Sequence, residues 1–138
     1  MNLGAVKESL TLRLSGGPTA PGRARTALGS LDRSFGELRN DVHLLVSELV
    51  SNSVVHGGAD QIELRASADP HVVRVEVTDP GSSANEPARR EPSTNGGGGF
   101  GLFLVDKVAH RWGTDHDSDM RVWFEIEHRS DRLAEPAL

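Results

Sequence analysis

ELVSNSVVH, residues 48–56, carries three polar side chains at a spacing that helix packing does not require. Glu48, Asn52 and His56 follow one another at intervals of four residues, so on an α-helix they lie close to one face, turning by about 40° at each step. An acid, an amide and an imidazole in such a row suit a site that holds a hydrated metal ion and activates a nucleophile. The alternative is a solvated helix face, which is polar by default.

The flanking sequence predicts that this helix is long and packs on a sheet. From residue 36 to 56, apolar residues recur at helical spacing and would face the sheet, and Gly57 and Gly58 would end the helix. A shorter helix is expected from about Thr19, as its N-cap, to Leu31, and another over residues 100–110.

Alternating apolar residues predict the strands. They occur over residues 8–14, 62–66, 73–79 and 122–126, with a further short strand beginning at Trp112 and a polar turn over 115–119. The order of elements predicts an α+β fold, a two-layer α/β sandwich with helices on one face of a mostly antiparallel sheet.

Composition restricts the class of protein. The chain has 138 residues, enough for one domain, which we place at residues 8–127 with flexible termini at 1–7 and 129–138. A net charge of −5 argues against non-specific binding to nucleic acid or membranes. There are no cysteines, the apolar runs are too short to span a membrane, and no signal peptide is visible. We therefore expect a cytoplasmic protein.

A second candidate site element stands at the end of a valine-rich strand. Asp79 is followed by Pro80 and Gly81. A carboxylate there can accept a hydrogen bond from an adenine amino group, and a glycine allows a flat base to approach the backbone. The alternative is an ordinary Asp-Pro-Gly turn.

The third element is a glycine run, GGGGFGL, at residues 96–102. Glycines before a helix expose backbone N–H groups and the positive end of the helix dipole, which suit a phosphate. The run matches neither a Walker loop nor the Rossmann pattern. The alternative is a flexible linker. The aperiodic stretch from 80 to 98 is long for a compact domain and suggests a lid.

In combination, E-x-x-x-N on a helix, D-x-G after a strand and G-x-G-L opening a helix resemble the GHKL (Bergerat-fold) ATPases. The short length, with ELVSNSVVHG and FGLFLVDKVAHRWG, is similar to the small bacterial anti-sigma factor serine/threonine kinases of that superfamily. The resemblance covers residues 8–127.

The resemblance implies a role for each matched residue. Glu48 corresponds to the catalytic acid, Asn52 to the Mg²⁺ ligand, and His56 to a less well-defined position of the nucleotide site. Asp79 and Gly81 correspond to the adenine-binding motif. Gly99, Gly101 and Leu102 correspond to the motif that cradles the phosphates, with the preceding Gly97 and Gly98 as the lid hinge and Phe100 inside the same cofactor-binding run. Ser83 stands where many relatives have a second glycine after Asp79.

The resemblance also implies cofactors and partners. The expected activity is ATP- and Mg²⁺-dependent phosphorylation of a serine on an anti-sigma antagonist with a STAS-type fold, and the expected second partner is a sigma factor sequestered by a homodimer. No direct nucleic-acid or membrane contact is expected. Two alternatives stay open: a nucleotide-binding module that sequesters a partner without phosphoryl transfer, and a simple ATP hydrolase.

Overall fold

The computed structural model describes residues 7–55, 60–79, 100–116 and 119–129, and within them one antiparallel sheet of five strands. The strand order is β1-β2-β3-β5-β4, and every neighbouring pair is antiparallel. The strands are β1 (Glu8–Ser15), β2 (Gln61–Ala68), β3 (Val72–Asp79), β4 (Arg111–His116) and β5 (Met120–Glu127).

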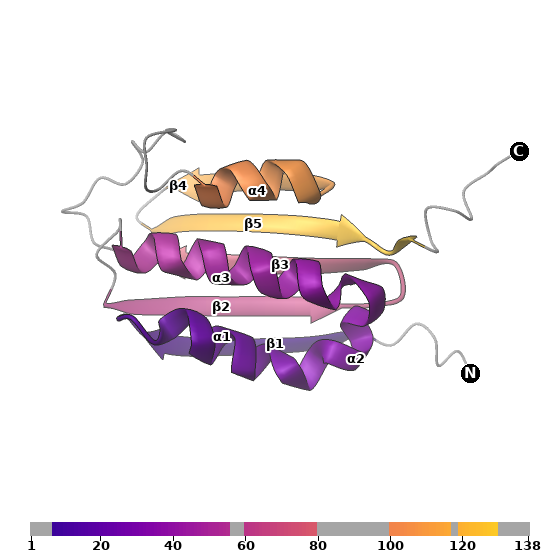
Figure 1. Cartoon of the computed structure of the whole chain (residues 1–138), viewed down its shortest axis with the longest axis horizontal. Coiled ribbons are helices and arrows are strands. Elements are labelled where there is room, and N and C mark those ends of the chain that lie inside the picture. The colour runs from indigo at the N-terminus through magenta and orange to yellow at the C-terminus, as the bar shows by residue number, and fades with distance from the viewer. Residues whose placement is uncertain (1–6, 56–59, 80–99, 117–118, 130–138) are drawn as a thin grey trace, which may run out of the picture.

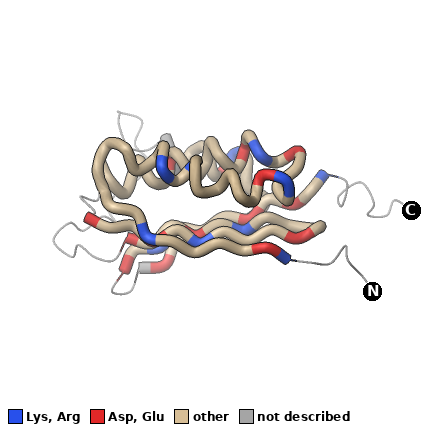
Figure 2. Tube along the Cα trace, turned by 90° about the horizontal axis from the view of Figure 1, so that it is seen from below, with Lys and Arg blue, Asp and Glu red and all other residues tan. Residues whose placement is uncertain are grey.

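The helices form a second layer on one face of this sheet (Figure 1 and Figure 2). They are α1 (Ala20–Leu28), α2 (Asp32–Phe35), α3 (Arg39–Val55) and α4 (Phe100–Val108), with 3₁₀ turns η2 (Gly29–Leu31) and η3 (Gly36–Leu38). α3 is the central helix, and it contacts α1, α4 and β3. The predicted two-layer α+β fold is therefore confirmed.

The core lies between the two layers because every second residue of the central strands points to the helices. Ile62, Leu64 and Ala66 of β2 are buried in alternation with more exposed neighbours, and Val73, Val75 and Val77 of β3 repeat the pattern. From α3 the core receives Val42, Leu45, Val46, Leu49 and Val50. Apolar residues thus recur at every second position along the strands and about every 3.6 positions along α3, and the two sets pack against each other in one layer.

The boundaries differ from the prediction in the first helical region. The expected helix to Leu31 ends as an α-helix at Leu28 and continues as a 3₁₀ turn, and Thr19 occupies the N-cap position without a side-chain capping bond. Gly36, with φ of 55°, ends α2, and the helix expected from residue 36 begins as a 3₁₀ turn before α3 starts at Arg39. A left-handed residue cannot continue a right-handed helix, so this glycine separates the two segments.

The strand predictions hold, with a longer β4 than expected. Asp115 and His116, assigned to a polar turn, are the last residues of β4, paired with Arg121 and Met120 of β5. Alternation of side chains is weak in this short strand, because Gly113 and the polar residues around it do not mark one face clearly.

The sheet face away from the helices is charged (Figure 2), and Arg74 of β3 lies within it. Its guanidinium donates hydrogen bonds to Glu76 Oε2 at 2.9 Å and Glu125 Oε2 at 2.8 Å, and lies 4.4 Å from the ring centroid of Trp123. Partial burial alone would lower the pKa of Arg74, but the two carboxylates raise it above its ordinary value.

The same face continues onto the outer strands through further ion pairs. Arg111 of β4 donates to Glu125 Oε1 at 2.8 Å, and Arg121 donates to Asp115 Oδ2 at 2.6 Å. Partial burial would by itself raise the pKa of Glu125, but hydrogen bonds from Arg111 and Arg74 outweigh it and lower that pKa. The charges of strands β3, β5 and β4 therefore satisfy one another.

Candidate functional site

Two residues of the predicted polar row, Glu48 and Asn52, lie on the last turns of α3. Glu48 and Asn52 are half-buried beside the buried Leu45 and Leu49, and they point away from the centre of the apolar stripe. Neither side chain forms a hydrogen bond or ion pair within the part of the chain that the structure describes. An acid and an amide on a packed helix, with no partner among residues 7–55, 60–79, 100–116 and 119–129, can be reached by a ligand.

Asp79 is the one polar side chain that is buried among the described residues, with 6% of its surface exposed. It is the last residue of β3 and continues the row of Val73, Val75 and Val77, so it faces the helix layer. Burying a carboxylate costs several kcal/mol unless hydrogen-bonding partners compensate, and an apolar residue would extend the row at no such cost. The end of β3 therefore holds a carboxylate beside the helix layer, in a position where an adenine amino group could donate a hydrogen bond to it.

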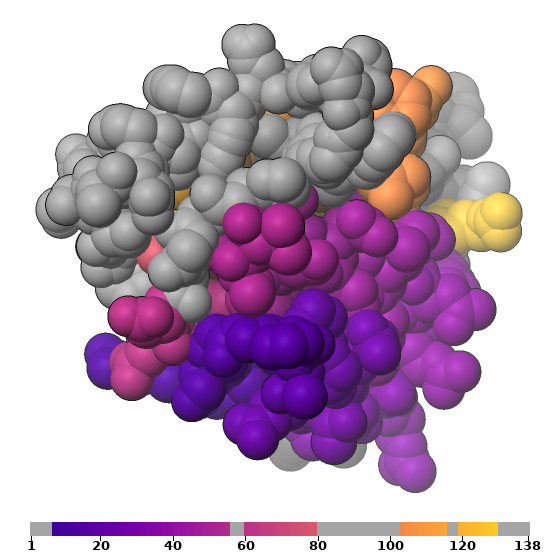
Figure 3. Space-filling model, turned by 60° about the vertical axis from the view of Figure 1, so that its left-hand side comes forward, coloured from indigo at the N-terminus to yellow at the C-terminus, as the bar shows by residue number. Residues whose placement is uncertain are grey.

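Three segments meet at one end of the molecule. The C-terminal end of α3, the C-terminal end of β3 and the N-terminal end of α4 all lie on the left-hand side of Figure 1. Figure 3 looks at this end, with the last turns of α3 at the surface between α1 and α4. The fold thus brings Glu48, Asn52 and Asp79 to the same end of the molecule from separate elements.

Five of the eleven predicted site residues fall outside the described residues. His56, Gly81, Gly97, Gly98 and Gly99 belong to this group. Phe100, Gly101 and Leu102 form the first turn of α4, as the glycine motif predicts. The backbone N–H groups of a first helical turn have no partner within the helix, so this end of α4 is suited to an anion.

The residues present fit a magnesium ion bound together with a polyphosphate. The amide oxygen of Asn52 is a neutral ligand without a competing partner in the described part of the chain. Mg²⁺ keeps several waters and commonly takes one or two protein oxygens plus phosphate. Among the described residues no three histidine or acidic side chains gather into a metal site of their own, so an ion held by Asn52 would take its remaining ligands from waters and phosphate oxygens.

Sequence reasoning missed two features of the structure. His43 Nε2 lies 2.7 Å from Asp32 Oδ1, and the His43 ring meets that of Phe35 edge-on, so this histidine links α2 to α3. A pocket of about 470 Å³ lies between η3, the start of α3 and the end of α4. Neither has a local signature, because each is formed by residues far apart in the sequence.

Comparison with protein families gives the classification. The model of the histidine kinase-like ATPase domain matches residues 19–124, which is most of the chain. The chain belongs to this family. A search of curated proteins finds no match.

Membership of the histidine kinase-like ATPase family explains why Asp79, the pair Glu48 and Asn52 of α3, and the start of α4 lie at the same end of the molecule. It supports ATP binding, and such domains generally bind ATP with Mg²⁺. The matched range contains every predicted site residue from Glu48 to Leu102. No helix in the described ranges has the length and apolar character that crossing a membrane requires.

Proposed function

We propose that this protein is an ATP-dependent protein serine/threonine kinase of the anti-sigma factor type. Its substrate would be a serine on a STAS-type antagonist, and the homodimer would sequester a sigma factor when the antagonist is phosphorylated. The observation that carries the proposal is Glu48, one turn before Asn52 in a histidine kinase-like ATPase domain, with no hydrogen-bond or ion-pair partner among the described residues. An acid in this position is placed to accept a proton, which favours phosphoryl transfer over nucleotide binding alone.

Each residue has a defined task in this reaction. Asp79 accepts a hydrogen bond from the adenine amino group, and the first turn of α4 donates backbone N–H groups to the phosphates. Asn52 supplies the protein ligand for Mg²⁺, which neutralises charge on the phosphates when bound.

Glu48 acts on the acceptor. Its carboxylate takes the proton from the serine hydroxyl as the serine oxygen bonds to the γ-phosphorus. The bond between the γ-phosphorus and the β,γ-bridging oxygen breaks, and ADP leaves with that oxygen. Positioning and charge neutralisation provide most of the acceleration, and proton removal adds a factor of about 10²–10⁴.

The test is incubation of the purified protein with γ-labelled Mg-ATP and a purified STAS-domain protein from the same genome. Label on a serine of that protein supports the kinase. If the antagonist stays unlabelled while ATP binds normally, the kinase proposal is wrong and the protein is a nucleotide-binding module. Steady phosphate release without a partner would instead indicate an ATP hydrolase. Co-purification with a sigma factor, and its loss on adding unphosphorylated antagonist, tests the regulatory role.

A further inference from the structure

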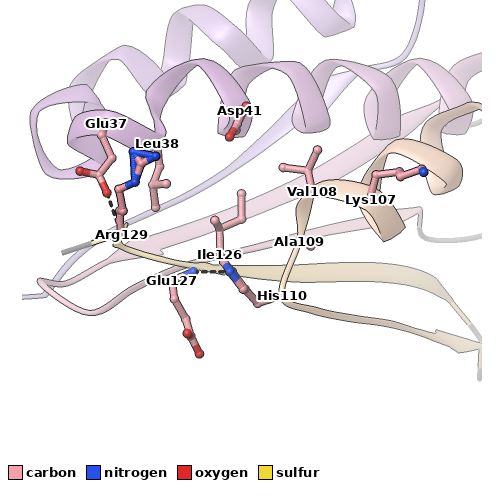
Figure 4. Close-up of a pocket in the computed structure, with 10 residues that line it drawn as sticks. All are labelled: Glu37, Leu38, Asp41, Lys107, Val108, Ala109, His110, Ile126, Glu127 and Arg129. Atoms are coloured by element: carbon pink, nitrogen blue, oxygen red, sulfur yellow. Dashed lines mark hydrogen bonds between the residues drawn. The ribbon is translucent and has the colours of Figure 1, made fainter. Parts of the chain in front are cut away.

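The pocket at the N-terminal end of α3 contains a carboxylate that has no counter-ion among the described residues. Asp41, in the first turn of α3, lines it and points over Ile126 and Val108 (Figure 4). Within the described residues Asp41 forms no hydrogen bond or ion pair. Its side chain is exposed, so the pocket is open to a group arriving from outside.

The cationic side chains that line this pocket form no ion pair with Asp41 among the described residues. Lys107 lies with its ammonium 5.3 Å from the ring centroid of Phe103 and points away from Asp41 (Figure 4). Arg129 donates its backbone N–H to Glu37 Oε2 at 2.6 Å, which fastens the end of β5 to η3. The carboxylate of Asp41 therefore has no ion-pair partner among the described residues, although Lys107 and Arg129 line the same pocket.

The floor of the pocket is apolar. Leu38 and Ile126 are 7% and 2% exposed, and Val108 and Ala109 lie beside them. A volume of about 470 Å³ is in the range of ligand sites. An apolar floor below a lone carboxylate matches an arginine or lysine side chain, whose alkyl stem packs on apolar surface while its head pairs with an acid.

Asp41 and Glu48 share one face of α3, with Leu44 between them on the intervening turn. Seven residues at 1.5 Å place Asp41 about 10 Å from Glu48, which an extended chain spans in about three residues. Leu44 is 43% exposed. Leu44, Val55 and Phe103 are the exposed large hydrophobic residues among those described, and all three lie on α3 or α4.

We propose that this face of α3 docks the phospho-acceptor segment of the partner protein, with a basic side chain in the Asp41 pocket about three residues from the hydroxyl presented to Glu48. An apolar residue between the two covers Leu44. The inference rests on the proposed kinase function and specifies its substrate: a segment with a basic residue at that distance, rather than an acidic one. The pocket thereby becomes a specificity site remote from the nucleotide.

The test uses fluorescent synthetic peptides and the full chain with a non-hydrolysable Mg-ATP analogue. Two peptides carry Ser, Leu and Arg with Arg three residues before or after Ser. Control peptides have Glu in place of Arg, or Arg adjacent to Ser. We expect one of the two Arg peptides to bind at least tenfold more tightly than its controls, measured by fluorescence anisotropy.

Charge reversal tests the pocket itself. Asp41→Lys should reverse the preference, so that the Glu peptide binds better than the Arg peptide. Asn40→Lys places the same charge in the same helical turn at a residue that does not line the pocket, and should leave the preference unchanged. Leu44→Ser should weaken both peptides. Melting temperatures show whether the variants stay folded.

The outcomes separate this inference from the kinase proposal. Absence of binding at millimolar peptide, or a preference that Asp41→Lys leaves unchanged, overturns the docking site. Selective binding that Asp41→Lys reverses, without phosphate transfer when Mg-ATP is supplied, supports the docking site and counts against the kinase.

Discussion

Polar side chains on the open face of the sheet pair with one another, whereas two polar side chains near the end of α3 have no partner among the described residues. On the open face, Arg74, Glu125 and Arg111 are joined by hydrogen bonds of 2.8 Å. On α3, Glu48 and Asn52 have no such partner in the described part of the chain. Charges that satisfy one another stabilise a surface, and polar groups left without partners on a rigid element are available for binding and chemistry.

The largest effect is expected on the rate of phosphoryl transfer when Glu48 is replaced. Glu48→Gln removes the proton acceptor and retains the shape, so phosphoryl transfer to the antagonist should fall by about 10²–10⁴, which corresponds to about 3–5 kcal/mol. ATP affinity, measured by calorimetry, should change little. Transfer at the normal rate in this variant would show that another group takes the proton.

Asp79 is expected to govern nucleotide affinity. Asp79→Asn replaces one acceptor oxygen with a donor facing the adenine amino group, so ATP should bind about 10–100-fold more weakly by calorimetry. Asp69→Asn is the matched control, because Asp69 lies at the opposite end of the β2–β3 hairpin, where it accepts the N–H groups of His71 and Val72. Equal losses in both variants would indicate a general effect on the hairpin.

The open face should respond in stability and not in nucleotide binding. A Cβ added at Gly113 would lie 2.9–3.1 Å from the side chain of Trp123, so Gly113→Ala must displace the ring from its place beside Arg74. We expect a loss of about 1–3 kcal/mol in urea unfolding. At Gly29 a Cβ would meet nothing within 4 Å, so Gly29→Ala should cost nothing. A tenfold loss of ATP affinity in Gly113→Ala would contradict the separation of the two regions.

The smallest predicted effect depends on pH. Because the folded-state pKa of Glu125 is lowered, its stabilising contribution is complete above the unfolded-state pKa, near 4.5, and is lost as the pH falls through the lower folded-state value. Glu125→Gln should therefore cost about 1–2 kcal/mol at pH 7, and progressively less below pH of about 4. A difference that stayed constant down to about pH 2 would show that charge is not the cause.

Much of the fold follows from periodicity. The alternation of Ile62 with Leu64, and of Val73 with Val75, predicts β2 and β3 because one face of each strand is buried. The 3₁₀ turns around α2 and the last residues of β4 could not be predicted in the same way. They depend on Gly36 adopting a left-handed conformation and on the pairing of β4 with β5.

The sequence predicts which residues belong to the site, but it does not predict which of them are buried or how their neighbours pair. The four-residue spacing places Glu48 and Asn52 on one helical face whatever the tertiary structure, since the geometry of the helix determines it. That Asp79 is buried, and that Arg74 pairs with Glu125 across 51 residues of sequence, depend on which strands become neighbours.

The sequence by itself therefore determined most of the helices and strands, the two-layer class and the ATPase motifs, because these depend on local spacing along helices and strands. Only the tertiary structure decided which polar groups are partnered and which are free. It buried Asp79, joined charges of β3, β5 and β4 to one another, and opened a pocket at Asp41, which has no counter-ion in the described part of the chain. The physical reason is that burial and pairing are set by neighbours in space, and chain folding brings those neighbours from distant positions.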